Sequence, residues 1–436
     1  TSSLAALARQ RLANARRLHQ LLPLGQDQQS TNMRRVLIDG IGVGFASAAS
    51  PFLPVLLTRL GAENFAVGLL TALPALAGLA FAIPIGHFLQ RQRQIVRWFS
   101  AARLMVIASY ALMGLVPLLF TDLRIEAILT VWALVTIPNT VVNVSFTVVM
   151  ANVAGPEGRF YLMSRRWSIL GLTNAITIAI VGQLLDLKGI PFPMNYSIVF
   201  GLLSLGGLVS YYFSSHIVLP DQTPLAQDEK RGSRGGWQRW RDLLRGQPAF
   251  VRFTASQFLF RMGMALALPL FPLYYVRNLH ASDASIGVIS TMNTIVLVGA
   301  YFLWSRITRR LGVPFALLTT TLGLALYPLL VAFTTSIEWM IVLAALGGIF
   351  GAGLDLVFFD VLVSSVPPES APTFVGIYQT TNNIAAFVGP LIGTVLSAYI
   401  GIPGALIAGG LIRLLGFVTF AFVNRLDNPQ PKLAAR

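Results

Sequence analysis

Apolar runs of about 20 residues or more, separated by short polar segments, fill most of the chain. A run of that length crosses the hydrocarbon core of a bilayer as an α-helix, because it rises about 30 Å. We expect twelve such spans, which are Val36–Leu57, Phe65–Ile85, Ile95–Phe120, Ala127–Val153, Trp167–Leu185, Tyr196–Leu219, Phe250–Val276, Ala284–Trp304, Pro314–Phe333, Trp339–Ser365, Phe374–Ala398 and Gly401–Val423. The pattern therefore predicts an all-α membrane protein with twelve transmembrane helices.

Composition agrees with a membrane location. Charged residues make up only 11% of the 436 residues, against about 25% of a typical soluble domain. The formal net charge of +15 could suit nucleic acid, but the basic residues lie in short loops between apolar runs rather than along one stripe. We therefore expect membrane lipids, and no nucleic acid, around this chain.

Several kinds of chemistry are excluded by what the sequence lacks. It contains no cysteine, so disulfides, thiol catalysis and cysteine metal sites are excluded, and its four histidines are far apart along the chain. We find no ATP-binding loop of the glycine-rich type with lysine and no nucleophile–base motif. We therefore expect neither an enzyme nor a bound metal or cofactor.

The distribution of arginine and lysine predicts the orientation, because cytoplasmic loops of membrane proteins are enriched in these residues. We place both termini and the long linker on the side with most basic residues, and the other side keeps only Arg59, Arg124, Lys188 and Arg277. Both termini are therefore expected in the cytoplasm, which agrees with an even number of spans. The expected location is the inner membrane of a bacterium.

The longest polar stretch separates the spans into two sets of six. The expected segments are a basic amphipathic N-terminal segment (1–35), a six-helix bundle (36–219), a cytoplasmic linker (220–249), a second six-helix bundle (250–423) and a cytoplasmic tail (424–436). In the linker, Trp237, Trp240 and Leu244 share one helix face flanked by arginines, which is typical of an interfacial helix.

The two sets of spans repeat parts of each other's sequence. Pro51-Phe52-Leu53-Pro54 followed by Arg59 matches Pro269-Leu270-Phe271-Pro272 followed by Arg277, with a constant offset of 218 (269−51, 272−54 and 277−59). Ile125-Glu126 matches Ile337-Glu338 with an offset of 212 (337−125 and 338−126). We therefore expect two pseudo-symmetric bundles, which can rock against each other around a central site.

The six-plus-six layout, the cytoplasmic linker and the loops after spans two and eight resemble the major facilitator superfamily across essentially the whole chain. In that family these loops carry the pattern Gly-x-x-x-Asp-Arg-x-Gly-Arg. The first copy here keeps Gly86 and Arg91 but has Gln90 in place of Asp, and the second keeps Arg310 and Gly312 and also lacks the Asp. The resemblance implies a secondary transporter that works by alternating access.

Charged residues inside a span are costly in a bilayer, so they are candidates for function. Arg261 and Asp355 are the most informative, because each lies about 15 Å from the cytoplasmic end of its span at 1.5 Å per residue. In the family resembled, spans one, four, seven and ten line a central cavity. We therefore expect the two residues to form a cavity pair that binds substrate or a coupling proton; the alternative is a static structural pair.

Uncharged polar residues in the spans extend this candidate site. By the repeat, Asn143 is the counterpart of Asp355, and Gln257 is the counterpart of Asp39. The polar run at the start of span eleven contributes Gln379, Asn382 and Asn383. These side chains either bond a polar solute or join helices, because lipid offers them no partner.

Two further groups complete the expected site. The aromatic cavity candidates, whose rings could stack on a ligand, are Phe258, Tyr274 and Phe358. The expected cytoplasmic gate consists of Asp39, Asp360, Arg91 and Arg310. Its two acids lie near cytoplasmic helix ends, where they can reach the interface.

The leading function is a secondary active transporter of a small organic solute, and an exporter of amphipathic compounds is one form of it. The prolines and glycine of span seven, Gly263, Pro269 and Pro272, resemble the drug-exporting branch. The alternatives are an uptake permease for a polar nutrient such as a sugar, and a permease-like assembly factor that transports nothing. We expect a monomer whose partners are the substrate, membrane lipids and coupling protons or sodium ions.

Overall fold

The computed structural model describes residues 28–220, 245–365 and 371–427, and every regular element in those ranges is an α-helix. The helices are α2 (Gln28–Ser47), α3 (Phe52–Arg59), α4 (Asn64–Gln90), α5 (Ile95–Leu119), α6 (Arg124–Leu185), α7 (Met194–Ser215), α9 (Pro248–Ala267), α10 (Leu270–Arg277), α11 (Asp283–Leu311), α12 (Val313–Ala332), α13 (Ile337–Ser364) and α14 (Ala371–Asp427). Most of the expected amphipathic segment and the expected interfacial helix around Trp237 lie outside the described residues.

Eleven helices in the described ranges are long and apolar enough to cross a membrane, so this is an integral, multi-pass membrane protein. The first ten expected spans coincide with ten of them, and the last two, Phe374–Ala398 and Gly401–Val423, fall within α14. The count of eleven therefore differs from the twelve that the sequence predicts. Gly401 interrupts α14 with φ 75°, a left-handed conformation that glycine adopts without strain.

The first and seventh expected spans are each broken into two helices beside a proline. Helix α2 ends at Ser47 and α3 begins after Pro51, whereas α9 ends at Ala267 and α10 begins after Pro269. A proline lacks the amide hydrogen that a continuous helix needs, so the helical hydrogen-bond ladder is interrupted at both positions.

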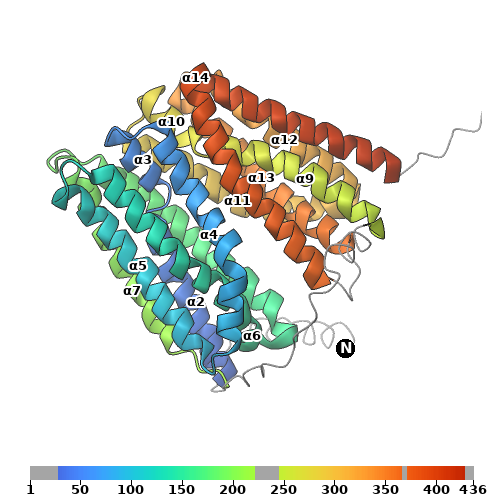
Figure 1. The fold of residues 1–436 in the computed structure, drawn as a ribbon, viewed down its shortest axis with the longest axis horizontal. Coiled ribbons are helices and arrows are strands. Elements are labelled where there is room, and N and C mark those ends of the chain that lie inside the picture. Colours follow the sequence, from blue (N-terminus) through green and yellow to red (C-terminus); the bar gives the residue numbers. More distant parts are fainter. Residues whose placement is uncertain (1–27, 221–244, 366–370, 428–436) are drawn as a thin grey trace, which may run out of the picture.

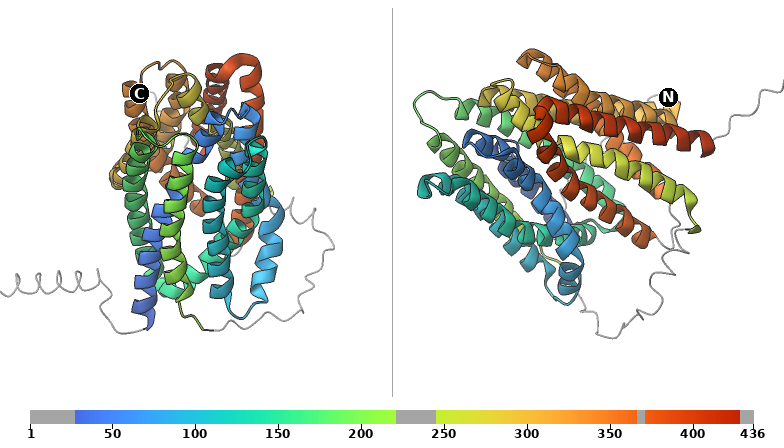
Figure 2. Two further views of the ribbon diagram at one scale, coloured as in Figure 1. Left: turned by 90° about the vertical axis from the view of Figure 1, so that its left-hand side faces the viewer. Right: turned by 45° about the horizontal axis from the view of Figure 1, so that its top comes forward.

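The helices gather in two groups, α2–α7 and α9–α14, which Figure 1 shows side by side. Within the first group α2 and α5 each pack against α6 and α7; within the second, α14 packs against α9 and α12, and α11 packs against α13. The groups meet where α4 contacts α14, α6 contacts α11 and α3 contacts α10. Figure 2 shows this arrangement from two further directions.

The two groups share a core at one end and have separate cores at the other. Around α3 and α10, one hydrophobic cluster includes side chains of both groups, such as Leu57 and Leu273. Toward the linker, the first group has its own cluster around Phe99, and the second group has another around Phe358. The molecule is therefore packed together at the α3–α10 end and divided at the linker end.

Two close helix approaches hold the packed end together. A Cβ added to Gly182 of α6 would lie 3.0 Å from the Cα of Gly287 on α11, so these positions accept no larger residue without movement. On the other flank, a Cβ on Gly68 of α4 would lie 2.6 Å from Oγ1 of Thr394 on α14. Glycine thus permits backbone contact between the groups on both sides.

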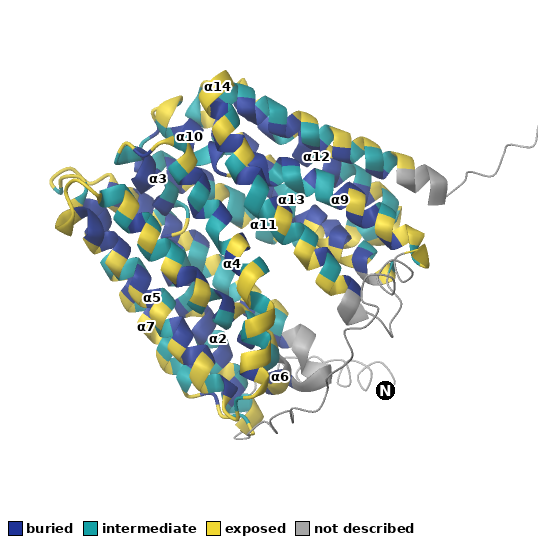
Figure 3. Ribbon diagram, viewed as in Figure 1, coloured by how far each residue is buried: buried dark blue, intermediate teal, exposed yellow. Residues whose placement is uncertain are grey.

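The helices carry many large exposed apolar side chains, and Figure 3 shows exposed positions along both groups. Phe302, Phe333 and Phe359 are 72%, 76% and 70% exposed. Such a surface would aggregate in water but is solvated by lipid tails, which explains how so few charges suffice.

Candidate functional site

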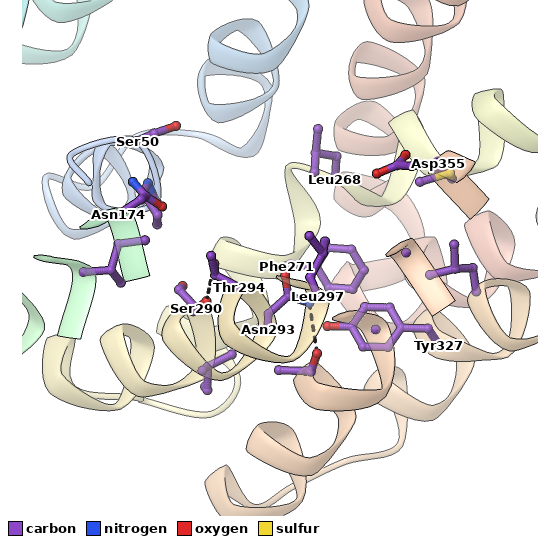
Figure 4. Close-up of a pocket in the computed structure, with 18 of the residues that line it drawn as sticks. Ser50, Asn174, Leu268, Phe271, Ser290, Asn293, Thr294, Leu297, Tyr327 and Asp355 are labelled. Atoms are coloured by element: carbon purple, nitrogen blue, oxygen red, sulfur yellow. Dashed lines mark hydrogen bonds between the residues drawn. The ribbon is translucent and has the colours of Figure 1, made fainter. Parts of the chain in front are cut away.

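A cavity of about 660 Å³, called here the central cavity, lies between the two helix groups. Its polar lining residues come from both groups and are Ser47, Ser50, Asn174, Tyr275, Ser290, Asn293, Thr294, Tyr327, Asp355 and Arg413. Figure 4 shows Ser50 and Asn174 across the cavity from Ser290 and Thr294. A cavity that offers polar groups among apolar helices can hold a water-soluble molecule inside the membrane.

The α9–α14 cavity, of about 600 Å³, adjoins the central cavity and shares Asp355 with it. Six of the residues predicted from the sequence line it together: Arg261, Asp355, Phe358, Gln379, Asn382 and Asn383. These residues come from α9, α13 and α14, and Figure 1 shows α9 beside α14. The structure thus brings most of the expected polar site into one space.

Arg261 and Asp355 share this cavity but make no ion pair within 4.0 Å in the part of the chain that the structure describes. Asp355 instead accepts a hydrogen bond from the hydroxyl of Tyr301 at 3.0 Å. The Arg261 guanidinium lies over the ring of Phe358, 5.3 Å from its centroid, and its buried Nε has no hydrogen-bond partner. The predicted direct pair is therefore absent, and both charges remain available to a ligand.

The predicted amides have divided roles. Gln257 is fully buried and donates to Oδ1 of Asn382, so these two side chains join α9 to α14. Asn383 packs against α4, 3.2 Å from where a Cβ on Gly78 would lie. Gln379 is an exposed lining residue of the α9–α14 cavity. Helix joining and cavity lining therefore both occur in this polar run.

Two of the three aromatic predictions are corrected by the structure. Phe258 lies in a separate apolar groove with Phe250 and Ile377, outside the α9–α14 and central cavities. Tyr274 is 3% exposed in the shared core and donates to the backbone oxygen of Thr334 at 2.7 Å. An aromatic ring suits a packed core as well as a cavity, so its presence in a span does not identify its surroundings.

The expected cytoplasmic gate is not assembled either. Arg91, Arg310 and Asp360 are exposed, and among the described residues no ion pair connects any of them. Asp39 is 1% exposed, so it does not reach the interface as expected. The correction for Asp39 has a physical cause, because a buried carboxylate is stable only with hydrogen-bonding partners inside the protein.

Those partners form a site that the sequence did not predict. Asp39 Oδ2 lies 2.9 Å from Nη2 of Arg166, and Asp39 Oδ1 accepts from the hydroxyl of Ser210 at 2.5 Å. Arg166 was expected in a cytoplasmic loop, but α6 is continuous there and Arg166 is 3% exposed. The signal for this pair was Asp39 itself, since an acid in a span requires a basic partner.

A third space, the α2–α7 cavity, borders this charge cluster and measures about 340 Å³. Its lining includes Arg103, Arg166, Asn139 and the predicted Asn143, and it shares Ser47 with the central cavity. Asn143 thus lies in the opposite helix group from its expected counterpart Asp355. Residues of span four therefore line this cavity, whereas spans five and eight contribute to the central cavity beside spans one, seven and ten.

Comparison with known proteins identifies this arrangement. The model of the Major Facilitator Superfamily matches residues 253–436, and curated relatives match in sequence. The second helix group, α9–α14, is therefore similar to this superfamily. One relative is the multidrug resistance protein MdtG of Proteus mirabilis (strain HI4320), which is 27% identical over 180 residues, or 40% of this chain and 44% of the relative. The superfamily consists of transporters rather than enzymes.

Further relatives extend the comparison. The staphyloferrin B transporter of Staphylococcus aureus (strain NCTC 8325 / PS 47) is 24% identical over 164 residues, which is 37% of this chain and 39% of that protein. The chain thus matches less than half the length of these two relatives. A crystal structure of a bacterial homolog of the human lysosomal transporter Spinster has the same fold, with a TM-score of 0.68 and 14% identity over 94% of this chain and 100% of that chain.

Proposed function

We propose that this protein is a member of the superfamily that carries a small organic solute across the membrane by alternating access, as a monomeric secondary transporter. The observation that carries the proposal is the central cavity, whose polar lining comes from both helix groups. A site between two bundles can be exposed to each side of the membrane in turn when the bundles rock against each other.

The proposal includes twelve spans in two pseudo-symmetric bundles. Helix α14 has 57 residues, which would extend about 85 Å against a hydrocarbon core of about 30 Å. The break at Gly401 supports two crossings in α14, which would bring the eleven apolar helices to twelve spans. The close approaches support the symmetry, because Gly68 and Gly287 are 219 residues apart (287−68) and their partners Gly182 and Thr394 are 212 apart (394−182).

The proposed orientation puts the termini, the linker and the divided end of the molecule in the cytoplasm. The basic loops support this direction through the positive-inside rule. The α9–α14 cavity extends to Leu362 and Val375, near the linker end of α13 and α14. We infer that the structure represents an inward-open state, with the α3–α10 end closed.

Asp355 is the proposed coupling residue, with Arg261 as its partner in the cycle. Among the described residues that line the three cavities, Asp355 is the sole carboxylate. A carboxylate in a cavity at membrane depth can bind a proton or a sodium ion and release it on the other side. Its separation from Arg261 leaves it free to do so in this state.

Export of amphipathic compounds is the proposed direction. The names of the relatives, a multidrug resistance protein and a staphyloferrin B transporter, support a carrier of organic compounds. The mixed lining of the central cavity, with Leu268 and Phe271 beside Ser290 and Asn293, suits a solute with both apolar and polar parts.

The test is solute flux in proteoliposomes that contain the purified full chain, under an imposed proton or sodium gradient. We expect uphill movement of an amphipathic compound, and no movement in liposomes without protein. Movement of sugars alone would favour the uptake permease. A complete absence of flux for dyes, sugars and organic ions under both gradients would favour a non-transporting assembly factor and overturn the proposal.

A further inference from the structure

Positive side chains outnumber negative ones around the three cavities. The arginines that line them are Arg103 and Arg166 in the α2–α7 cavity, Arg413 in the central cavity and Arg261 in the α9–α14 cavity. Asp355 is the sole lining carboxylate among the described residues. A guanidinium remains charged at any physiological pH, so the lining of the three cavities together carries more positive than negative charge, and the excess is greatest in the α2–α7 cavity.

In the α2–α7 cavity, one carboxylate serves two arginines. Both oxygens of Asp39 are already occupied, Oδ2 by Arg166 at 2.9 Å and Oδ1 by Ser210 at 2.5 Å. Nε of Arg103 lies 3.9 Å from Oδ1 of Asp39, which is too far for a hydrogen bond. Arg103 and Arg166 therefore share the single negative charge of Asp39, and the three side chains together keep one net positive charge.

Arg103 is 8% exposed, yet none of its guanidinium N–H groups donates a hydrogen bond to a described residue. Besides Asp39, the ring of Phe99 lies close to Arg103, with its centroid 4.7 Å from Cζ. A ring face attracts the charge but leaves the N–H donors in the guanidinium plane without acceptors. Because Arg103 lines the α2–α7 cavity, an anionic group bound there can accept charge-assisted hydrogen bonds from it.

The surroundings of Arg103 are suited to an anionic group. Asn139 and Asn143 line the same cavity and offer neutral amide donors, and Trp167 provides an aromatic wall. Arg166 is held in place by its pairing with Asp39. The cavity shares Ser47 and Leu170 with the central cavity, so a solute bound between the helix groups can extend its anionic end to Arg103.

We propose that the transported solute is an organic anion, and that its carboxylate or phosphate-like group binds Arg103 in the α2–α7 cavity. This inference rests on the proposed transport function and names its substrate class. An anionic lipid headgroup has the same chemistry, but the lining comes from four helices of one group and is continuous with the central cavity, which favours a soluble solute. The apolar part of the solute would lie in the central cavity beside Leu268 and Phe271.

The test uses three probes of one size and different charge: benzoate, neutral benzamide and cationic benzamidine. Binding to the purified full chain in detergent is followed by tryptophan fluorescence at constant ionic strength, because Trp167 lines the cavity. We expect benzoate to bind most tightly, and Arg103→Gln to raise the Kd of benzoate by at least about tenfold, as expected for a lost charge-assisted hydrogen bond. Arg97→Gln, which removes an exposed arginine of the same helix, should leave it unchanged.

Tighter binding of benzamidine than of benzoate, or an unchanged benzoate Kd in Arg103→Gln, would overturn the anion site. If Arg103→Gln does not fold, Arg103→Lys is the second variant, because it keeps the charge but loses the planar guanidinium donors. Arg103→Lys should weaken the binding of benzoate and leave the binding of benzamide unchanged. An unchanged benzoate Kd would count against the site. Nanodiscs with and without phosphatidylglycerol test whether an anionic lipid headgroup occupies the site. If adding this lipid abolishes the benzoate binding that depends on Arg103, the lipid competes for Arg103, and the proposal of a soluble solute is overturned.

The two proposals can fail separately. Flux of neutral or cationic compounds, with no benzoate binding or movement, would leave transport intact and overturn the anion site. Arg103-dependent benzoate binding together with an absence of all flux would support the anion site and overturn transport.

Discussion

Arg59 of α3 reaches from one helix group to the other, where its Nε donates to Oδ1 of Asp283 on α11 at 2.9 Å and its Nη2 donates to the backbone oxygen of Ala281. Arg277, the repeat counterpart of Arg59, reaches in the opposite direction and donates to Asn64 and to the backbone oxygen of Ala62. The acceptor positions are related too, because 281−62 and 283−64 both give 219. Two reciprocal arginines therefore close the packed end.

Replacing Arg59 should open that end, because Asp283, which is 5% exposed, would lose its charged partner. The chain has no cysteine, so a single Ser290→Cys reports on the central cavity. We expect a membrane-impermeant maleimide added outside to label this cysteine slowly in the native background and several-fold faster with Arg59→Gln. Lys188→Gln, an exposed charge on the same side, should change nothing, and equal labelling in both variants would contradict the role of Arg59.

The Asp39–Arg166 pair should be essential for stability. Arg166→Gln leaves a carboxylate that is 1% exposed without its cation, and breaking such a buried pair costs about 3–5 kcal/mol of unfolding free energy. The double variant Asp39→Asn/Arg166→Gln should be more stable than Arg166→Gln alone, because no buried carboxylate is left without the cation that bonds it. Thermal unfolding in detergent measures both, with the exposed Arg91→Gln as control, and native stability of Arg166→Gln would refute the pairing.

Bulk at the α6–α11 contact should prevent closure of the packed end. In Gly287→Val the added Cβ would lie 3.0 Å from the Cα of Gly182, and overpacking of this kind costs about 1–3 kcal/mol. We expect a lower melting temperature and reduced flux. Gly299→Val on the same helix has nothing within 4 Å of the added Cβ and should be tolerated. Comparable losses in the two variants would show that the close approach is not the cause.

Removing the cavity carboxylate should uncouple transport from the ion gradient. In Asp355→Asn we expect uphill flux to fall by about tenfold or more, because the charged partner of the coupling ion is lost. Solute exchange without a gradient should persist, since the cavity keeps its shape. Asp360→Asn removes an exposed carboxylate five residues further along α13 and serves as the matched control. Full uphill flux in Asp355→Asn would exclude Asp355 as the coupling residue.

The sequence predicted the spans and much of the α9–α14 cavity for one physical reason. Lipid solvates apolar side chains and rejects charges, so long apolar runs must be helices and the polar residues within them must face the protein interior. This argument located Arg261, Asp355 and Gln379 in one cavity. It could not place Phe258 or Tyr274, because an aromatic ring is equally stable against lipid, core or cavity.

The missed features depend on contacts between distant parts of the chain. Arg166 follows Asp39 by 127 residues in the sequence. The basic residues beside it are typical of a cytoplasmic loop, and only the structure shows that Arg166 lies within the continuous helix α6. Arg59 and Asp283 lie at helix ends, where charge is normally exposed and carries no signal. Helices that are apolar on all sides have no periodicity to tell which face meets the cavity, so only the tertiary structure shows it.

Cross-linking of the packed end tests the rocking of the two helix groups most directly. Nδ2 of Asn64 donates to Oγ of Ser397 on the other group at 2.7 Å, so Asn64→Cys/Ser397→Cys should cross-link with a short thiol reagent. Asn32→Cys/Val218→Cys joins two positions of the first group and is the control. We predict that the first cross-link stops solute flux until it is cleaved, whereas the control cross-link permits flux. Undiminished flux through fully cross-linked Asn64→Cys/Ser397→Cys protein would contradict alternating access.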